Sequence, residues 1–197
     1  MTYELINVTT EAGKVGVITL NRPKQLNALK TEVLATLSNE QLKGLKAAEI
    51  GGLSTDQLKA LTTAQLQSLD AAQLKGLTSA QMGSLASDRI QALTTTQFAG
   101  LSASQVNGLV SQFSKIETAD IAALNVTTVA GLSTAAIQAL TTAQTQALTK
   151  GQLQSLTTSQ LNAMASDDLQ KLSSSQVTSL KVDQVSKLSS DQLNTLT

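Results

Sequence analysis

An eight-residue period runs through this sequence from Leu37 to its last residue, and it limits the possible folds more than any other feature. Each unit reads Leu, Ser or Thr, two variable residues, Gln, an aliphatic residue, a variable residue and a small residue, as in LTTAQLQS from Leu61. Regular units also begin at Leu53, Leu69, Leu77, Leu93, Leu132, Leu140, Leu148, Leu156, Met164, Leu172, Leu180 and Leu188. Repetition at a short fixed period is typical of solenoids and related arrays.

A single long helix and a β-strand both fit this period poorly. In one continuous helix an eight-residue repeat turns the apolar stripe by roughly 80° per copy, so no face stays apolar. In a strand, the two apolar positions of each unit would point to opposite faces, and Ala, Gln and Asp are poor strand formers.

Short helices fit the unit well. Thr62 and Gln65 have the spacing of a capping box, in which Thr62 caps the helix and Gln65 reaches back to the backbone N–H of Thr62. Leu61 and Leu66 then occupy the two positions of a hydrophobic staple. Asp in the first turn and Lys near the end suit the helix dipole, and a small last residue allows a tight corner. These residues are Asp56, Asp88, Asp183 and Asp191, then Lys43, Lys59, Lys75, Lys171 and Lys187, then Gly44, Gly76, Gly100, Gly108 and Gly131.

Such short helices require neighbours. Burial of two aliphatic side chains contributes roughly 3–6 kcal/mol per unit, whereas ordering eight residues costs about 12 kcal/mol. Units must therefore stack and share a core, as in other repeat proteins. We expect a mainly α protein, an α-solenoid with two units per coil, lined inside by aliphatic side chains and outside by Thr, Ser, Gln and Lys.

The pattern is irregular between residues 109 and 131. The unit LVSQFSK, from Leu109 to Lys115, is one residue short, and Glu117, Asn125 and Thr128 depart from the consensus. Phe98 and Thr145 replace the sixth-position aliphatic residue in two other units. We interpret the irregular stretch as a kink in the array, with a binding site as the alternative.

Composition excludes several classes of function. The formal net charge is zero and 14% of residues are charged, which argues against nucleic-acid binding and against a polybasic membrane-surface module. Cysteine and histidine are absent, so thiolate chemistry, the usual general base and the commonest metal ligand are absent too. No apolar run is long enough for a transmembrane helix. No conventional signal peptide is recognisable, so we expect a cytoplasmic location or export without a signal peptide.

Residues 1–36 do not repeat and form a first part of the chain, with residues 37–197 as the second. Two strands are expected, over residues 5–8 and 15–20, as a β-hairpin that leads through Asn21-Arg22-Pro23 into a helix over about 24–37. VGVITLNRPKQLNAL, residues 15–29, resembles the opening of the enoyl-CoA hydratase (crotonase) family. That resemblance implies acyl-CoA binding, with Arg22 and Lys24 near the CoA end, but the family's later catalytic elements are not recognisable here. We interpret this part first as a structural hairpin that caps the first coil, next as a fusion remnant, and last as a remnant or divergent enoyl-CoA hydratase with retained CoA binding.

The repeats resemble Leu-Thr-Thr-Ala-Gln-Leu arrays of large bacterial surface or exported proteins. The leading hypothesis is therefore a structural or interaction module, a spacer or scaffold without catalytic activity, whose partner is a protein or a second copy. We expect no nucleic-acid partner, no membrane insertion and no small-molecule ligand, and we assign no catalytic, cofactor-binding or metal residue.

Two further hypotheses rest on particular side chains. Rows of threonines could form a hydroxyl array that binds ice or a glycan, although we favour the interpretation that they are solvated helix starts. These are Thr55, Thr63, Thr95, Thr134, Thr142 and Thr158. Asp120 and the pair Asp167-Asp168 are possible acid–base carboxylates, but acidic residues near helix starts are more often partners of the helix dipole.

Overall fold

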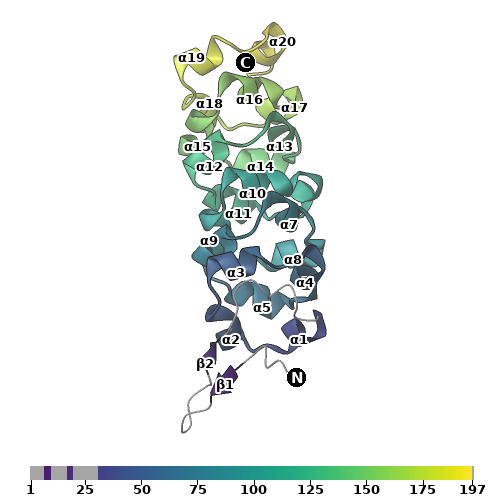
Figure 1. Ribbon diagram of the computed structural model, residues 1–197. Coiled ribbons are helices and arrows are strands. Elements are labelled where there is room, and N and C mark those ends of the chain that lie inside the picture. The colour runs from purple at the N-terminus through teal and green to yellow at the C-terminus, as the bar shows by residue number, and fades with distance from the viewer. Residues whose placement is uncertain (1–6, 10–16, 20–30, 197) are drawn as a thin grey trace.

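The computed structural model describes residues 7–9, 17–19 and 31–196. Residues 31–196 form an elongated stack of short helices, with α1 (Thr31–Thr36) at one end and α20 (Ser190–Thr195) at the other (Figure 1). The expected solenoid of short helices is therefore the architecture of the repeats.

The helices lie in three columns, because each helix packs against the helix three units further along the chain. The first column holds α1, α4 (Thr55–Ala60), α7 (Ser79–Gly83), α10 (Ala103–Gly108), α12 (Val126–Ala130), α15 (Lys150–Ser155) and α18 (Ser174–Val177). The second holds α2 (Asn39–Lys43), α5 (Thr63–Ser68), α8 (Ser87–Ala92), the 3₁₀ helix η2 (Val110–Lys115), α13 (Thr134–Gln138), α16 (Thr158–Ala163) and α19 (Val182–Val185). The third holds α3 (Ala47–Gly51), α6 (Ala71–Lys75), α9 (Thr95–Gly100), α11 (Thr118–Ala123), α14 (Thr142–Ala147), α17 (Ser166–Gln170) and α20.

One coil of the stack therefore contains three units, and the expectation of two units per coil is wrong. The chain turns where the first Leu of a unit adopts the extended conformation, as Leu61, Leu69, Leu101 and Leu156 do. Leu61, for example, ends α4 with φ −63° and ψ 135°. Three such corners close one coil, and the next coil lies on top of it.

Most units form the capping box as expected, whereas α8, α11, α12 and α17 have no side-chain cap. The Thr62 hydroxyl accepts a hydrogen bond from Gln65 N at 3.2 Å, and Gln65 Oε1 accepts one from Thr62 N at 2.8 Å. Leu61 and Leu66, the two staple positions, are both fully buried. Local sequence thus determines where each helix starts and which two side chains it directs into the core.

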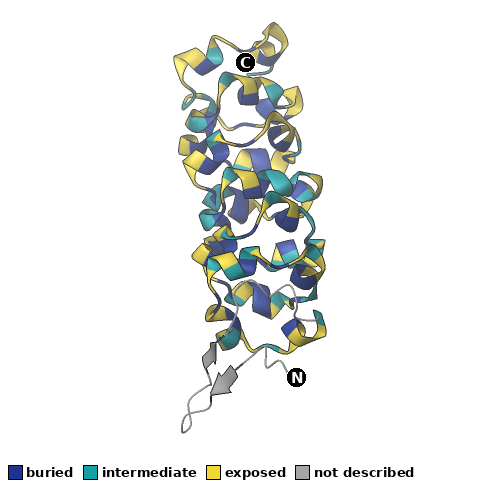
Figure 2. Ribbon diagram, viewed as in Figure 1, coloured by how far each residue is buried: buried dark blue, intermediate teal, exposed yellow. Residues whose placement is uncertain are grey.

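The core runs without interruption through the stack, between the three columns (Figure 2). First-position and sixth-position aliphatic side chains fill it, together with Phe98, Phe113 and the fully buried Ile50. The glutamines at the fifth position are buried as well, so the expectation that glutamine lines the outside fails at this position. The buried members are Gln57, Gln65, Gln73, Gln81, Gln97, Gln105, Gln144, Gln152, Gln160, Gln176, Gln184 and Gln192.

These glutamines bind one coil to the next. Gln65 Nε2 donates to the carbonyl oxygens of Leu34 at 3.1 Å and Leu37 at 2.8 Å, at the corner between α1 and α2. Gln65 thus caps its own helix through Oε1 and holds the corner beneath it through Nε2. Gln73, Gln97, Gln105, Gln144, Gln152, Gln160, Gln176, Gln184 and Gln192 make equivalent bonds.

Glycine permits the closest contacts between coils. A methyl group on Gly76 would overlap the carbonyl oxygen of Ala47 in the coil below, and one on Gly108 would overlap that of Ser79. Position eight of one unit therefore lies directly on position three of the unit three places earlier. Small residues are needed at these positions because two backbones meet, in addition to any role at the corner.

The short unit occupies one ordinary place in the second column. Its helix η2 packs between α8 and α13, and Phe113 fills the core with 1% of its surface exposed. Gln112 Nε2 donates to Leu85 O at 2.7 Å, so the corner bond survives the loss of one residue. The stack continues through the irregular stretch with the same order of columns.

At the start of the chain, β1 (Asn7–Thr9) and β2 (Val17–Thr19) pair antiparallel, with Val8 opposite Ile18. Their connection and residues 20–30 lie outside the described residues, as does most of the helix expected over 24–37. The helix α1 already packs on α4, so the stack begins before residue 37.

Candidate interaction surfaces

The outer surface carries the helix-capping hydroxyls and the third- and fourth-position side chains (Figure 2). The six threonines of the proposed hydroxyl array do not form one row. Thr55 lies in the first column, Thr63, Thr134 and Thr158 in the second, and Thr95 and Thr142 in the third. Only α13 and α16, which carry Thr134 and Thr158, are direct neighbours among these helices.

Two of these threonines pair with buried carboxyl groups. Thr142 Oγ1 donates to Asp168 Oδ1 at 2.6 Å, and the Thr95 hydroxyl bonds in the same way to Asp120. Asp120 and Asp168 stand at the fifth position of their units, where glutamine is the rule. They belong to α11 and α17, which are separated by α14, so they do not form a catalytic carboxylate pair. Asp167 is exposed.

Asp120 lies in an unfavourable place for a negative charge. Desolvation by burial raises the pKa of its carboxyl, the nearby Glu117 charge raises the pKa further, and the hydrogen bond from Thr95 lowers the pKa in part. A glutamine amide at this position would donate to the corner carbonyl oxygens, whereas an ionised carboxylate has no hydrogen to donate. Asp120 therefore occupies the position of a fifth-position glutamine in the stack but lacks the amide that donates hydrogen bonds.

Positions with other residues confirm that the fifth side chain serves the corner. Arg89 Nε donates to Leu61 O at 3.0 Å, and the Thr128 hydroxyl donates to Leu101 O at 2.9 Å. The capping box alone would accept Glu as readily as Gln. The preference for Gln within this chain was therefore the available sequence signal for a second, donating role.

Amides at the seventh position bond in the opposite direction along the stack. Gln67 Nε2 donates to Ala92 O at 2.8 Å and Gln154 Nε2 to Ser179 O at 2.8 Å, each at the end of the helix above. Gln146 and Asn162 do the same with Lys171 and Lys187. These bonds satisfy terminal carbonyls that a short helix leaves open.

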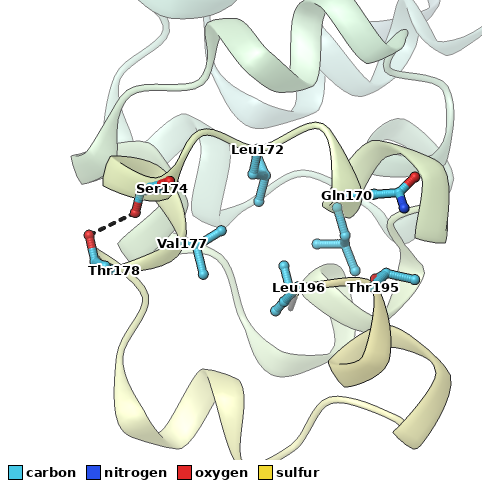
Figure 3. A pocket seen from close by; sticks show the side chains of 8 residues that line it. Gln170, Leu172, Ser174, Val177, Thr178, Thr195 and Leu196 are labelled. Carbon is cyan, nitrogen blue, oxygen red and sulfur yellow. Dashed lines mark hydrogen bonds between the residues drawn. The ribbon is translucent and has the colours of Figure 1, made fainter.

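A pocket of about 330 Å³ opens at the last coil, between α18 and the ends of α17 and α20 (Figure 3). It is lined by Leu169, Gln170, Leu172, Ser174, Val177, Thr178, Thr195 and Leu196. Thr178 Oγ1 donates to Ser174 O at 2.9 Å on its wall. None of these side chains titrates near neutral pH, so the pocket offers shape and apolar surface but no acid or base.

Charged side chains on the outer surface are scattered. Lys43 pairs with Glu40 at 2.9 Å, Lys59 with Asp56 at 4.0 Å, and Arg89 with Asp88, all near the surface. Among the described residues, no group of three acidic side chains is placed to hold a metal ion. In the same part of the chain, no helix has the length and apolar character to cross a membrane.

The repeats decide the family of the chain. The profile of the ALTTAQ repeat matches residues 50–87, 113–150 and 161–197, together more than half of the sequence. The chain belongs to the ALTTAQ repeat family. No curated protein matches it.

The ALTTAQ repeat matches begin at residue 50, and nothing supports the resemblance of residues 15–29 to the crotonase family. Within that segment the structure describes Val17–Thr19 as β2, while Arg22 and Lys24 lie outside the described residues. The family of this chain is therefore assigned from its ALTTAQ repeats alone.

Proposed function

We propose that the ALTTAQ stack is a spacer or scaffold, which holds what lies at its two ends apart and presents a long polar surface to protein partners. The observation that carries this proposal is the repeated corner bond, from Gln65 to Gln192, which ties each coil to the one before it. A continuous core and a regular set of cross-coil bonds favour a stiff rod, because each repeat is held by its neighbours on both sides.

The outer surface supports the same role. Over residues 31–196 it consists of hydroxyls, amides, small residues and a few scattered charges. The large hydrophobic side chains exposed in this range are Val33, Val126, Val182 and Leu193. Such a surface remains soluble over a long length and leaves recognition to several weak contacts spread across neighbouring coils.

A deletion in phase with the repeat tests this proposal. Removing residues 148–171 takes out three whole units and joins Ala147 to Leu172, so each column loses one helix. The helices α12, α13 and α14 would then pack against α18, α19 and α20 of the same columns. Small-angle scattering should show a rod shortened by one coil, about 8–10 Å, with an unchanged cross-section. Circular dichroism should show the same helicity per residue.

A deletion out of phase is the control. Removing residues 152–171 cuts through a unit and should disturb the caps and corners on both sides, with a loss of helicity beyond the deleted residues. If the in-phase deletion leaves the length of the particle unchanged, or if both deletions behave alike, the spacer proposal is wrong.

A further inference from the structure

Within residues 31–196, the first and last coils expose groups that lie between coils in the rest of this range. At the first coil, Gln41 Oε1 accepts from Ser38 N at 2.8 Å, but its Nε2 makes no hydrogen bond with the described residues. Val33, at the fifth position of its unit, is 36% exposed. We call the face of α1, α2 and α3 that points away from α4, α5 and α6 the N-terminal end face.

The last coil exposes apolar side chains that a further coil would cover. Val182 is 82% exposed and Leu193 is 38% exposed, whereas Leu153 and Leu161, at the sixth position like Leu193, are fully buried. The pocket beside Val177 opens at this coil, between α18 and the ends of α17 and α20 (Figure 3). We call the face of α18, α19 and α20 that points away from α15, α16 and α17 the C-terminal end face.

The order of the columns brings these faces into register. Helices follow one another in the order first, second and third column, and α20 belongs to the third. The next place above it is in the first column, to which α1 belongs. A second copy added in line would therefore lay its α1 on α18, its α2 on α19 and its α3 on α20.

We infer that the C-terminal end face binds the N-terminal end face of a second copy of this chain, so that copies associate head to tail. The interface is a continuation of the one between consecutive coils. This association does not depend on the spacer role, since it needs only the two end faces.

The contacts follow from those within the stack. Gln184 in α19 donates to Leu153 O and Leu156 O beneath it, so Gln41 of the second copy would donate to Val177 O and Leu180 O. Gly76 lies on Ala47 and Gly108 on Ser79, so Gly44 of the second copy would lie on Val182.

The third column offers a match for Glu49, the fifth-position side chain of α3. Thr142, at the third position of its unit, donates to Asp168 at the fifth position three units later. Ser190 and Glu49 occupy the same two positions at the two ends, so the Ser190 hydroxyl would donate to Glu49 of the second copy. In each column, a hydrogen-bond donor, a small residue or an apolar side chain of one end face would therefore meet a suitable partner on the other end face.

A head-to-tail contact joins two different faces, so it does not close on itself and can extend into longer chains. Sedimentation velocity and small-angle scattering on the full chain, from micromolar to millimolar concentration, test the inference. The mass should rise above 20.5 kDa in steps of one chain. The particle should lengthen while its cross-section stays constant. The strands β1 and β2 lie near α2 at this end (Figure 1), and the full chain includes them.

Two variants separate this geometry from other forms of association. Val182→Asp blocks the C-terminal end face, and Gly44→Trp blocks the N-terminal end face because its side chain would overlap the backbone at Val182 of the other copy. Val182 and Gly44 are both exposed, so the fold should survive. Each variant alone should stay monomeric where the unmodified chain associates. An equimolar mixture should form dimers, since each variant keeps one intact face, but nothing longer.

Thr96→Asp is the matched control, because it places the same charge on the exposed side of α9 in the middle of the stack. It should associate like the unmodified chain. A chain that stays monomeric throughout, a cross-section that grows with concentration, a mixture that remains monomeric, or an equal effect of Thr96→Asp would each overturn the inference.

Discussion

Gln152 Nε2 donates to the carbonyl oxygen of Leu124 at 2.8 Å, across 28 residues of sequence and one coil of the stack. The same side chain accepts from Thr149 N at 2.8 Å through Oε1, and 1% of its surface is exposed. One amide therefore completes a local helix cap and a long-range corner. Few side chains can do both, because the two roles need an acceptor and a donor on neighbouring atoms.

Gln152→Glu should separate the two roles. A carboxylate still accepts from Thr149 N, but it faces the carbonyl oxygens of Ile121 and Leu124 without a proton to donate. We expect a loss of about 2–4 kcal/mol in the free energy of unfolding at neutral pH, measured by urea denaturation. Gln41→Glu is the control, since Gln41 Nε2 holds no corner in the described residues, and it should cost little.

The position of Gly76 against Ala47 predicts that a single methyl group separates two coils. Gly76→Ala should lower the free energy of unfolding by about 1–3 kcal/mol, because neither backbone can move away without disturbing its column. Gly151→Ala is the matched control. Its added methyl group would meet Val126 Cγ1 at 3.5 Å, an ordinary contact, and should stabilise helix α15 by about 0.5–1 kcal/mol. Equal effects of the two changes would contradict the close approach.

Asp120 should make the stability depend on pH. Burial raises the pKa of its carboxyl in the folded protein, so the folded state binds the proton more tightly than the unfolded state. Its effect is most favourable below the unfolded pKa, about 3.9, and stability is lost as the pH rises through the folded pKa. Asp120→Asn should therefore be more stable than the unmodified chain at neutral pH, with a difference that shrinks in acid.

Thr95→Val provides the second arm of that experiment. It removes the hydrogen bond that lowers the pKa of Asp120, so the loss of stability should continue to a higher pH and become larger. Urea titrations between acid and neutral pH would show both effects. If the pH range over which the free energy of unfolding falls does not change when Thr95 is replaced, this hydroxyl does not stabilise the carboxylate.

Thr145 is the one sixth-position side chain in the regular units that is not apolar, and 1% of its surface is exposed. Thr145→Val keeps the shape of the side chain and replaces the hydroxyl by a methyl group next to an aliphatic core. We expect the free energy of unfolding to rise by about 1 kcal/mol. Thr134→Val, at an exposed position in the helix before it, should change stability much less.

The capping boxes could be predicted because all their atoms lie within one unit. Thr62, Gln65, Leu61 and Leu66 are close in sequence, and the spacing alone determines which hydrogen bonds a short helix can make. The need for stacking also followed, since one unit buries too little apolar surface to remain folded alone.

The sequence by itself thus determined the unit, its two ends and its two core side chains. Only the tertiary structure decided that three units close one coil, that the fifth-position glutamines turn inward, and that Gly76 lies on Ala47. The physical reason is that the units are nearly identical. Each unit could pack on the second or the third unit after it with the same side chains, and no local feature distinguishes these partners. The choice depends on how much the chain turns at each corner, summed over 24 residues, and on which arrangement lets every corner carbonyl find a donor.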